Sequence, residues 1–237
     1  HKTVRRQRQM CIRDSHMIAR SEIEPDANEA RKLREQARER ILNARKLFAA
    51  EAAEAAAALT DFPKVIDARL SPKLRSEKAR AENRHVSAQL QLATCTMVEA
   101  LSLRLLSDER ADRLSAAADE FEALYQKNRT RVGGQFARIQ QARCLQFLGQ
   151  PEAAVGIYSD LLASPGHSQI ANRALLFSFI SLNDERSDRD GVLRRASDWL
   201  AKAPLEQQRS LIGAGILWEE ARACLLYTSP SPRDLWI

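Results

Sequence analysis

The residues of this chain that could do acid–base, nucleophilic or metal chemistry are scattered along it. Its inner histidines, His16, His85 and His167, lie far apart, and none has a partner at metal-ligand spacing. Three serines also lack a histidine in the context of a nucleophile motif: Ser107, Ser115 and Ser164. We therefore expect loop or solvent histidines, no metal site and no catalytic residue.

Two pairs of adjacent carboxylates could be read as acid–base dyads: Asp119–Glu120 and Glu219–Glu220. Both pairs lie in helical patterns, where the side chains of adjacent residues diverge instead of facing each other. A solvated helix face is the simpler interpretation. These pairs add no catalytic site, and no pattern in the chain indicates a cofactor.

A glycine pair, Gly133–Gly134, follows Arg129 and Arg131. It could begin an anion-binding helix, because free backbone N–H groups and arginines favour phosphate. However, no Walker or dinucleotide pattern surrounds the pair, and no strand pattern precedes it. A phosphate site is therefore the less favoured interpretation.

The two ends of the chain resemble one translated DNA element in opposite orientations. The stretch MCIRD (10–14) can be encoded by ATGTGTATAAGAGAC, and with one further A its reverse complement, TGTCTCTTATACACAT, encodes CLLY (224–227) and the start of Thr228. The flanking RRQRQ and SPSPRD resemble the outer tails of transposon-library sequencing adapters. We therefore expect residues 1–15 and 224–237 to be adapter-derived, without a native fold. The alternative is a basic N-terminal arm and a proline-rich tail.

Excluding those ends changes what the composition implies. The 237-residue chain has a net charge of +6, but residues 1–15 carry five basic and one acidic side chain and residues 224–237 one of each, which leaves +2. So small a charge does not indicate nucleic-acid binding.

The remaining cysteines, Cys95 and Cys144, lack CxxC spacing and are expected to be buried thiols. No apolar run is long enough for a membrane span, and the compartment and oligomeric state stay open.

Abundant alanine and few aromatic residues favour an all-α fold. Residues 26–60 form one helical pattern, opened by Asp26 with Glu29 three residues on, and a second pattern begins at Pro72. Each pattern has one apolar face: Leu33, Ala37, Ile41, Ala44 and Phe48 on the first, and Val86, Leu90, Ala93, Met97, Leu101 and Leu105 on the second. We expect a long antiparallel helical hairpin within residues 16–106. A coiled coil is the alternative, although strict heptads are not sustained.

Shorter helices are expected within residues 107–223. Their predicted ranges are 108–127, 131–148, 151–163, 168–182, 189–202 and 205–222, with an exposed charged connection over 183–190. Every second helix carries a similar residue set: Ala117, Phe121, Leu124 and Tyr125, then Ala154, Tyr158, Leu161 and Leu162, then Val192, Ala196, Trp199 and Leu200. The offsets between these sets are 37 and 38 residues. A helix pair that repeats at this length is typical of an α-solenoid.

The stretch LGQPEAA (148–154), followed by Tyr158, Leu162 and Pro165, resembles the tetratricopeptide repeat. In that resemblance Gly149 makes the turn, Ala154 lies where the paired helices touch, and Tyr158 and Leu162 pack behind it. The resemblance covers roughly residues 108–203. The large aromatic residue and the Leu-Gly pair that are usual in the first helix are missing, and the repeat is longer than the typical 34 or so residues.

The resemblance implies a partner-binding surface along the first helix of each pair, namely residues 131–148 and 168–182. The expected partner-binding residues are Gln140, Arg143 and Gln146 on the first helix and Asn172 and Arg173 on the second. An arginine flanked by amides suits a peptide carboxylate or acidic side chain, because its planar fork binds two oxygens at once. The alternative is that all five are ordinary solvated residues.

Together these patterns predict a non-catalytic helical-repeat scaffold that binds a protein or peptide partner through a concave, helix-lined surface. An accessory segment of a larger, truncated enzyme or of a secretion or envelope assembly is the alternative. A helical nucleic-acid binder is a third interpretation, which the small net charge disfavours.

Overall fold

The computed structural model describes residues 17–63, 71–163, 168–186 and 188–228. Helices account for most of these residues, and no strand occurs among them, which confirms the all-α prediction. The chain divides into two compact units, His1–Cys144 and Leu145–Ile237. The division falls inside α5 (Val132–Phe147), and within the first unit α4 (Asp108–Lys127) packs against α3 (Pro72–Leu101).

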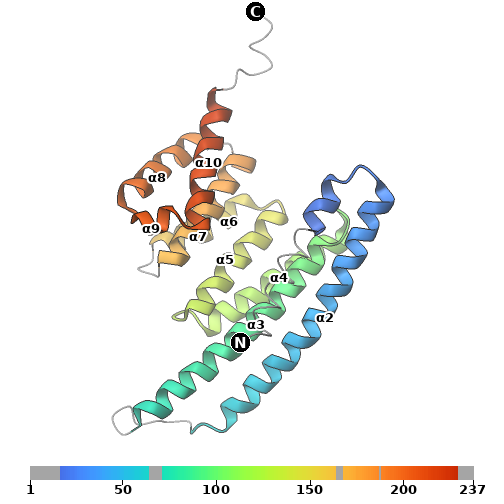
Figure 1. The fold of residues 1–237 in the computed structure, drawn as a ribbon, viewed down its shortest axis with the longest axis vertical. Coiled ribbons are helices and arrows are strands. Elements are labelled where there is room, and N and C mark those ends of the chain that lie inside the picture. The colour runs from blue at the N-terminus through green and yellow to red at the C-terminus, as the bar shows by residue number, and fades with distance from the viewer. Residues whose placement is uncertain (1–16, 64–70, 164–167, 187, 229–237) are drawn as a thin grey trace, which may run out of the picture. The chain divides into compact units, whose positions relative to one another are not determined.

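The first unit is built on a long helical hairpin. Helices α2 (Ala27–Thr60) and α3 run side by side in opposite directions, as Figure 1 shows in blue and green. Helix α2 begins where predicted, because the Asp26 carboxylate accepts hydrogen bonds from the backbone N–H groups of Asn28 and Glu29. Helix α3 begins at Pro72, whose missing N–H costs nothing in the first turn.

Small residues let the two hairpin helices approach closely. The buried face of α2 is mostly alanine with two large side chains: Ala30, Ala37, Ile41, Ala44, Phe48 and Ala55. On α3, burial is concentrated in the second half, from Ala93 to Ala100, and α4 packs against this helix too. The core of the unit therefore lies around the C-terminal half of α3.

The predicted apolar face of α3 extends too far at its C-terminal end. Helix α3 ends at Leu101, and Leu105 lies in the following loop with 65% of its surface exposed. The hydroxyl of Ser102 donates to the Glu99 carbonyl at 2.6 Å, and the Arg110 guanidinium donates to the carbonyls of Leu101 and Leu103. These bonds satisfy carbonyls that a longer helix would have used.

The second unit packs four helices around one apolar cluster. These are α6 (Pro151–Ala163), α7 (Ser168–Ser181), α8 (Arg189–Lys202) and α10 (Leu211–Thr228). Helix α6 packs on α7, and α10 packs on both α7 and α8. The buried members of the cluster are Leu175, Phe179, Leu182, Val192, Ala196, Ile216 and Ala223.

Two predicted segments of this unit differ in the structure. The charged stretch after α7 begins as a five-residue π-helix (Leu182–Arg186), and Asn183 is buried instead of lying on an exposed connection. The single helix predicted over 205–222 is two helices, a short α9 (Leu205–Gln208) and then α10. Ser210 starts α10, because its hydroxyl accepts a hydrogen bond from Gly213 N–H at 3.0 Å.

Residues 1–15 lie outside the described part of the chain, and so do 229–237. Between these ends, helix α10 continues past Ala223 to Thr228. The two described side chains beyond Ala223, Cys224 and Leu225, are both exposed.

Candidate partner-binding surface

The five expected partner-binding residues lie on α5 and α7 but belong to different units. Gln140 and Arg143 lie on the part of α5 that belongs to the first unit. Gln146, Asn172 and Arg173 belong to the second unit. The five residues therefore form two separate sets.

In the first unit, Arg143 and Gln140 form a pair one turn apart on α5. The Arg143 guanidinium donates to Oε1 of Gln140 at 3.2 Å, and both residues are half-buried. Three neighbouring positions, Ala137, Ile139 and Ala142, are buried, so one side of the helix packs and the other carries this polar pair. The amide oxygen directs the guanidinium along the helix surface.

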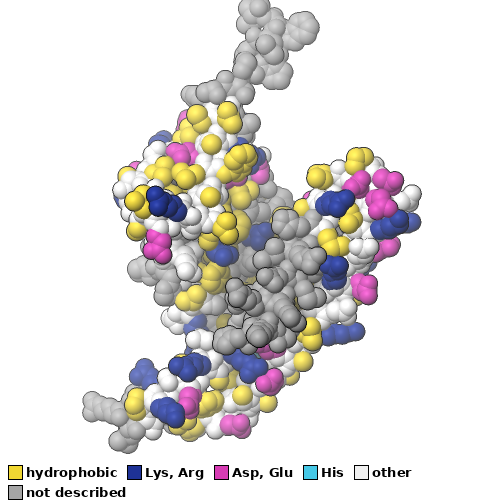
Figure 2. Space-filling model, viewed as in Figure 1, with side chains coloured by type: hydrophobic (Ala, Val, Ile, Leu, Met, Phe, Trp, Pro, Cys, Tyr) yellow, Lys and Arg dark blue, Asp and Glu magenta, His cyan; other side chains and the backbone are white. Residues whose placement is uncertain are grey.

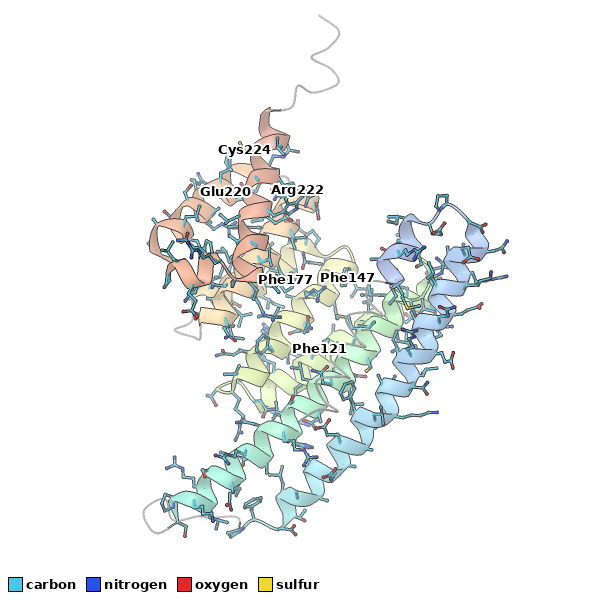
Figure 3. The ribbon with its side chains drawn as sticks, in the orientation of Figure 1. Phe121, Phe147, Phe177, Glu220, Arg222 and Cys224 are labelled. Carbon is cyan, nitrogen blue, oxygen red and sulfur yellow. The ribbon has the colours of Figure 1, made fainter. Side chains whose placement is uncertain are left out.

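Gln146, in the last turn of α5, forms hydrogen bonds with α6 and α7 of the second unit. Its Oε1 accepts a hydrogen bond from the Tyr158 hydroxyl at 2.6 Å, and its Nε2 lies 3.5 Å from the Phe177 carbonyl, to which it donates. The rings of Tyr158 and Phe177 lie 6.3 Å apart between centroids (Phe177 is labelled in Figure 3). Both ends of the Gln146 amide are therefore engaged within the fold.

Asn172 has a similar internal role. It is buried, and its Oδ1 accepts a hydrogen bond from the indole N–H of Trp199 at 2.9 Å. Its Nδ2 donates to Oε1 of Gln207 at 3.1 Å, so the side chain joins α7 to α8 and α9. The sequence carried one signal for this role, since a packed tryptophan usually needs an acceptor for its indole N–H.

Arg173, the next residue on α7, is exposed. Partial desolvation lowers the pKa of its guanidinium from the ordinary value, but arginine remains charged at neutral pH. Of the three candidates in the second unit, Arg173 is the exposed residue.

The four residues that the resemblance assigns to the repeat lie at the turn before α6 and on α6 itself. Gly149 has a φ of +72°, the left-handed conformation that glycine adopts at the end of a helix. Ala154 and Tyr158 are completely buried on α6. Leu162 is only partly buried and packs at the edge of the unit's apolar cluster.

Two charged networks were not found from the sequence. In the first unit, the buried Glu99 carboxylate accepts from Arg45 at 3.1 Å and lies 3.3 Å from Arg113, so it links α3 to α2 and α4. Each partner lies on another helix, and no local pattern would have paired them.

The second network surrounds Glu219 on α10. This buried carboxylate accepts from Nδ2 of Asn183 at 2.9 Å and from Arg222 at 3.1 Å, and Arg222 also pairs with Asp184 (Glu220 and Arg222 are labelled in Figure 3). Helix α10 is thereby attached to the π-helical segment. Glu219 therefore does not lie on the solvated face that we expected.

The glycine pair at the start of α5 has a packing explanation. A Cβ atom at Gly133 would lie 2.6 Å from a methyl carbon of Val86, and one at Gly134 would lie 2.0 Å from the carbonyl oxygen of Asn128. Only glycine allows these approaches.

Two of the histidine and serine candidates that the structure describes, His85 and Ser107, form hydrogen bonds within the fold. Nδ1 of His85 lies 3.3 Å from the carbonyl oxygen of Ala52, and Ser107 caps α4 by accepting from Arg110 N–H. His16, His167 and Ser164 lie outside the described residues.

In the part of the chain that the structure describes, no three His, Cys, Asp or Glu side chains gather closely enough to hold a metal ion. Within the same ranges, none of the helices combines the length and apolarity that crossing a bilayer requires.

On the face drawn in Figure 2, charged side chains of both signs are interspersed with hydrophobic ones. Comparison with known proteins found no matching family model, and no significant match among curated proteins or among solved structures.

Proposed function

We propose that this chain is a helical-repeat scaffold that binds a protein or peptide partner through the first helices of its pairs, with α5 in the first unit and α7 in the second considered separately. The observation that carries the proposal is a burial pattern that repeats with the sequence. The leading two residues of each set are Ala117 and Phe121, Ala154 and Tyr158, and Val192 and Ala196, and all six are 0% exposed. Such a pattern is expected when each second helix packs in the same register.

Because the second helices of the pairs supply these buried residues, we assign recognition to the polar sides of α5 and α7. Gln146 and Asn172 hold the helices in place through internal hydrogen bonds. We assign partner contact to Arg143 in the first unit and, as a separate candidate, to Arg173 in the second. A guanidinium binds a carboxylate through two parallel hydrogen bonds, so the partner is a peptide segment that carries aspartate, glutamate or a free C-terminus.

Binding to an array of acidic peptides tests this proposal. Each peptide is paired with a counterpart in which Asn and Gln replace Asp and Glu, and the full chain is applied at moderate salt. We expect retention by a subset of the acidic peptides and not by their counterparts. In fluorescence titrations with a retained peptide, Arg143→Ala or Arg173→Ala should weaken binding by ~5- to 150-fold, the equivalent of losing one charged hydrogen bond.

Arg194→Ala is the matched control, because Arg194 is an exposed arginine on α8, a second helix of a pair. This variant should bind like the unmodified chain. Equal retention of acidic and amide peptides, or an equal loss with Arg194→Ala, would refute the proposed surface.

A further inference from the structure

Helix α10 has two apolar faces, and only one of them is covered. Ile216 and Ala223 are completely buried where α10 packs on α7 and α8. On the opposite face lies a row of exposed residues, which we call the α10 stripe: Leu211, Ala214, Trp218, Ala221 and Leu225. Leu211 is 93% exposed, Trp218 67% and Leu225 66%. Four of the five precede residue 224, where the stretch that resembles adapter sequence begins.

The spacing of the stripe fits another helix. Its members follow one another at steps of three, four, three and four residues, so they form one seam along α10. The large side chains occupy one heptad position, and the alanines occupy the other. When two such seams pair in antiparallel orientation, the two heptad positions face each other, so each alanine meets a large residue of the partner and one leucine of each copy remains at an end of the seam.

That complementarity makes a second copy of this chain the best occupant. The stripe offers both the knobs and the holes, as a two-fold contact between identical surfaces requires. The exposed parts of two leucines, a tryptophan and two alanines amount to roughly 500 Å² per copy, so a pair that covered all of them would bury roughly 1,000 Å², and the leucine left at the end of each seam reduces this area. An interface of this size is close to the lower limit for specific association, so the affinity is expected in the micromolar range.

We propose that two copies of this chain associate through antiparallel pairing of their α10 helices along the α10 stripe. This association is independent of the peptide-binding surface on α5 and α7. Each dimer would carry two copies of that surface.

Sedimentation equilibrium of the full chain over ~1 to 200 µM, in reducing buffer so that Cys224 cannot form a disulfide, tests the proposal. We expect the mass to rise from monomer to dimer and no further. Trp218→Glu should weaken the dimer at least tenfold, because it places a charge in the seam. Leu205→Glu is the control, since Leu205 is also 66% exposed but lies on α9 outside the stripe. It should leave the dimer unchanged.

A double variant separates specific pairing from general hydrophobic adhesion. Ala214→Leu with Ala221→Leu enlarges the apolar area but fills the holes, so it should weaken the dimer if the seams interlock. Both alanines are exposed, so the monomer should remain folded, as circular dichroism at low concentration would show. A monomer at every concentration, a ladder of larger assemblies, tighter association of the double variant, or equal loss with Leu205→Glu would each overturn the proposal.

Discussion

The Tyr158 hydroxyl donates a hydrogen bond to Oε1 of Gln146 at 2.6 Å, and Tyr158 itself is completely buried. Tyrosine was expected from the sequence only as the aromatic residue that fills the space behind Ala154. Its hydroxyl also fixes an amide that donates to the Phe177 carbonyl. One side chain therefore supports both the apolar packing and the polar connection between helices of the second unit.

Tyr158→Phe should lower the free energy of unfolding by ~1 to 3 kcal/mol, because it leaves the Gln146 oxygen without its donor. Gln146→Leu should cost a similar amount by leaving the hydroxyl without an acceptor. The double variant should lose less than the sum of the two, with a coupling energy of ~0.5 kcal/mol or more in urea denaturation. Strictly additive losses would show that the two groups do not interact.

Two substitutions on α6 should have opposite effects on stability. Ala154→Leu inserts a larger side chain at a completely buried position and should destabilise the fold by ~1 to 3 kcal/mol. Gly156→Ala is the control on the same helix, since a Cβ there would meet nothing within 4 Å. It should stabilise the fold by ~0.5 to 1 kcal/mol. An unchanged melting midpoint for Ala154→Leu would show that the repeat register is wrong.

Cys144 should be unreactive in the folded chain. Burial raises the pKa of its thiol to about 12 and outweighs the opposing effect of the Arg143 charge, and Glu120 raises the pKa further. At pH 8 only about one thiol in ten thousand would be ionised, and the thiolate is the form that reacts. Alkylation with iodoacetamide, followed by peptide mapping, should modify the exposed Cys224 and spare Cys144 until denaturant is added. Equal rates at the two cysteines in the native chain would contradict the buried position.

The helix boundaries could be predicted because they depend on neighbours in sequence. Asp26, Pro72, Ser107 and Pro151 each start a helix with their own side chain or ring, within one turn of the boundary. Spacing alone also predicted buried positions of the hairpin such as Ala37, Ile41 and Phe48. Residues next to each boundary were thus sufficient to predict where these helices begin.

The roles of polar residues could not be predicted in the same way, because their partners are distant in the sequence. Asn172 bonds with Trp199, 27 residues away, and Asn183 bonds with Glu219, 36 residues away. The sequence predicted Asn172 as a partner-binding residue and placed Asn183 in an exposed connection. In the structure, Gln146 and Asn172 form hydrogen bonds within the fold, and Arg173 is exposed.

A final prediction concerns pH and a pair that joins α4 to α5 in the first unit. Burial pushes the pKa of the Glu122 carboxyl upward, but hydrogen bonds from Gln126, Gln141 and Arg138 together with the Arg138 charge outweigh burial, so the net pKa is lowered. The Arg138 guanidinium donates to this carboxylate at 2.5 Å. The side chains remain partly exposed, so the contribution should be no more than ~1 kcal/mol.

Because the folded pKa lies below that of the unfolded chain, the ionised pair stabilises the fold fully above the unfolded value of about 4.3. That stabilisation is lost as the pH falls through the folded pKa. Glu122→Gln should therefore lower the melting midpoint at pH 7, and the difference from the unmodified chain should shrink below about pH 4. Asp119→Asn, an exposed change on the same helix, should not show this pH-dependent difference. A Glu122→Gln difference that stays constant from pH 7 to about pH 3 would show that the carboxylate charge is not what joins the two helices.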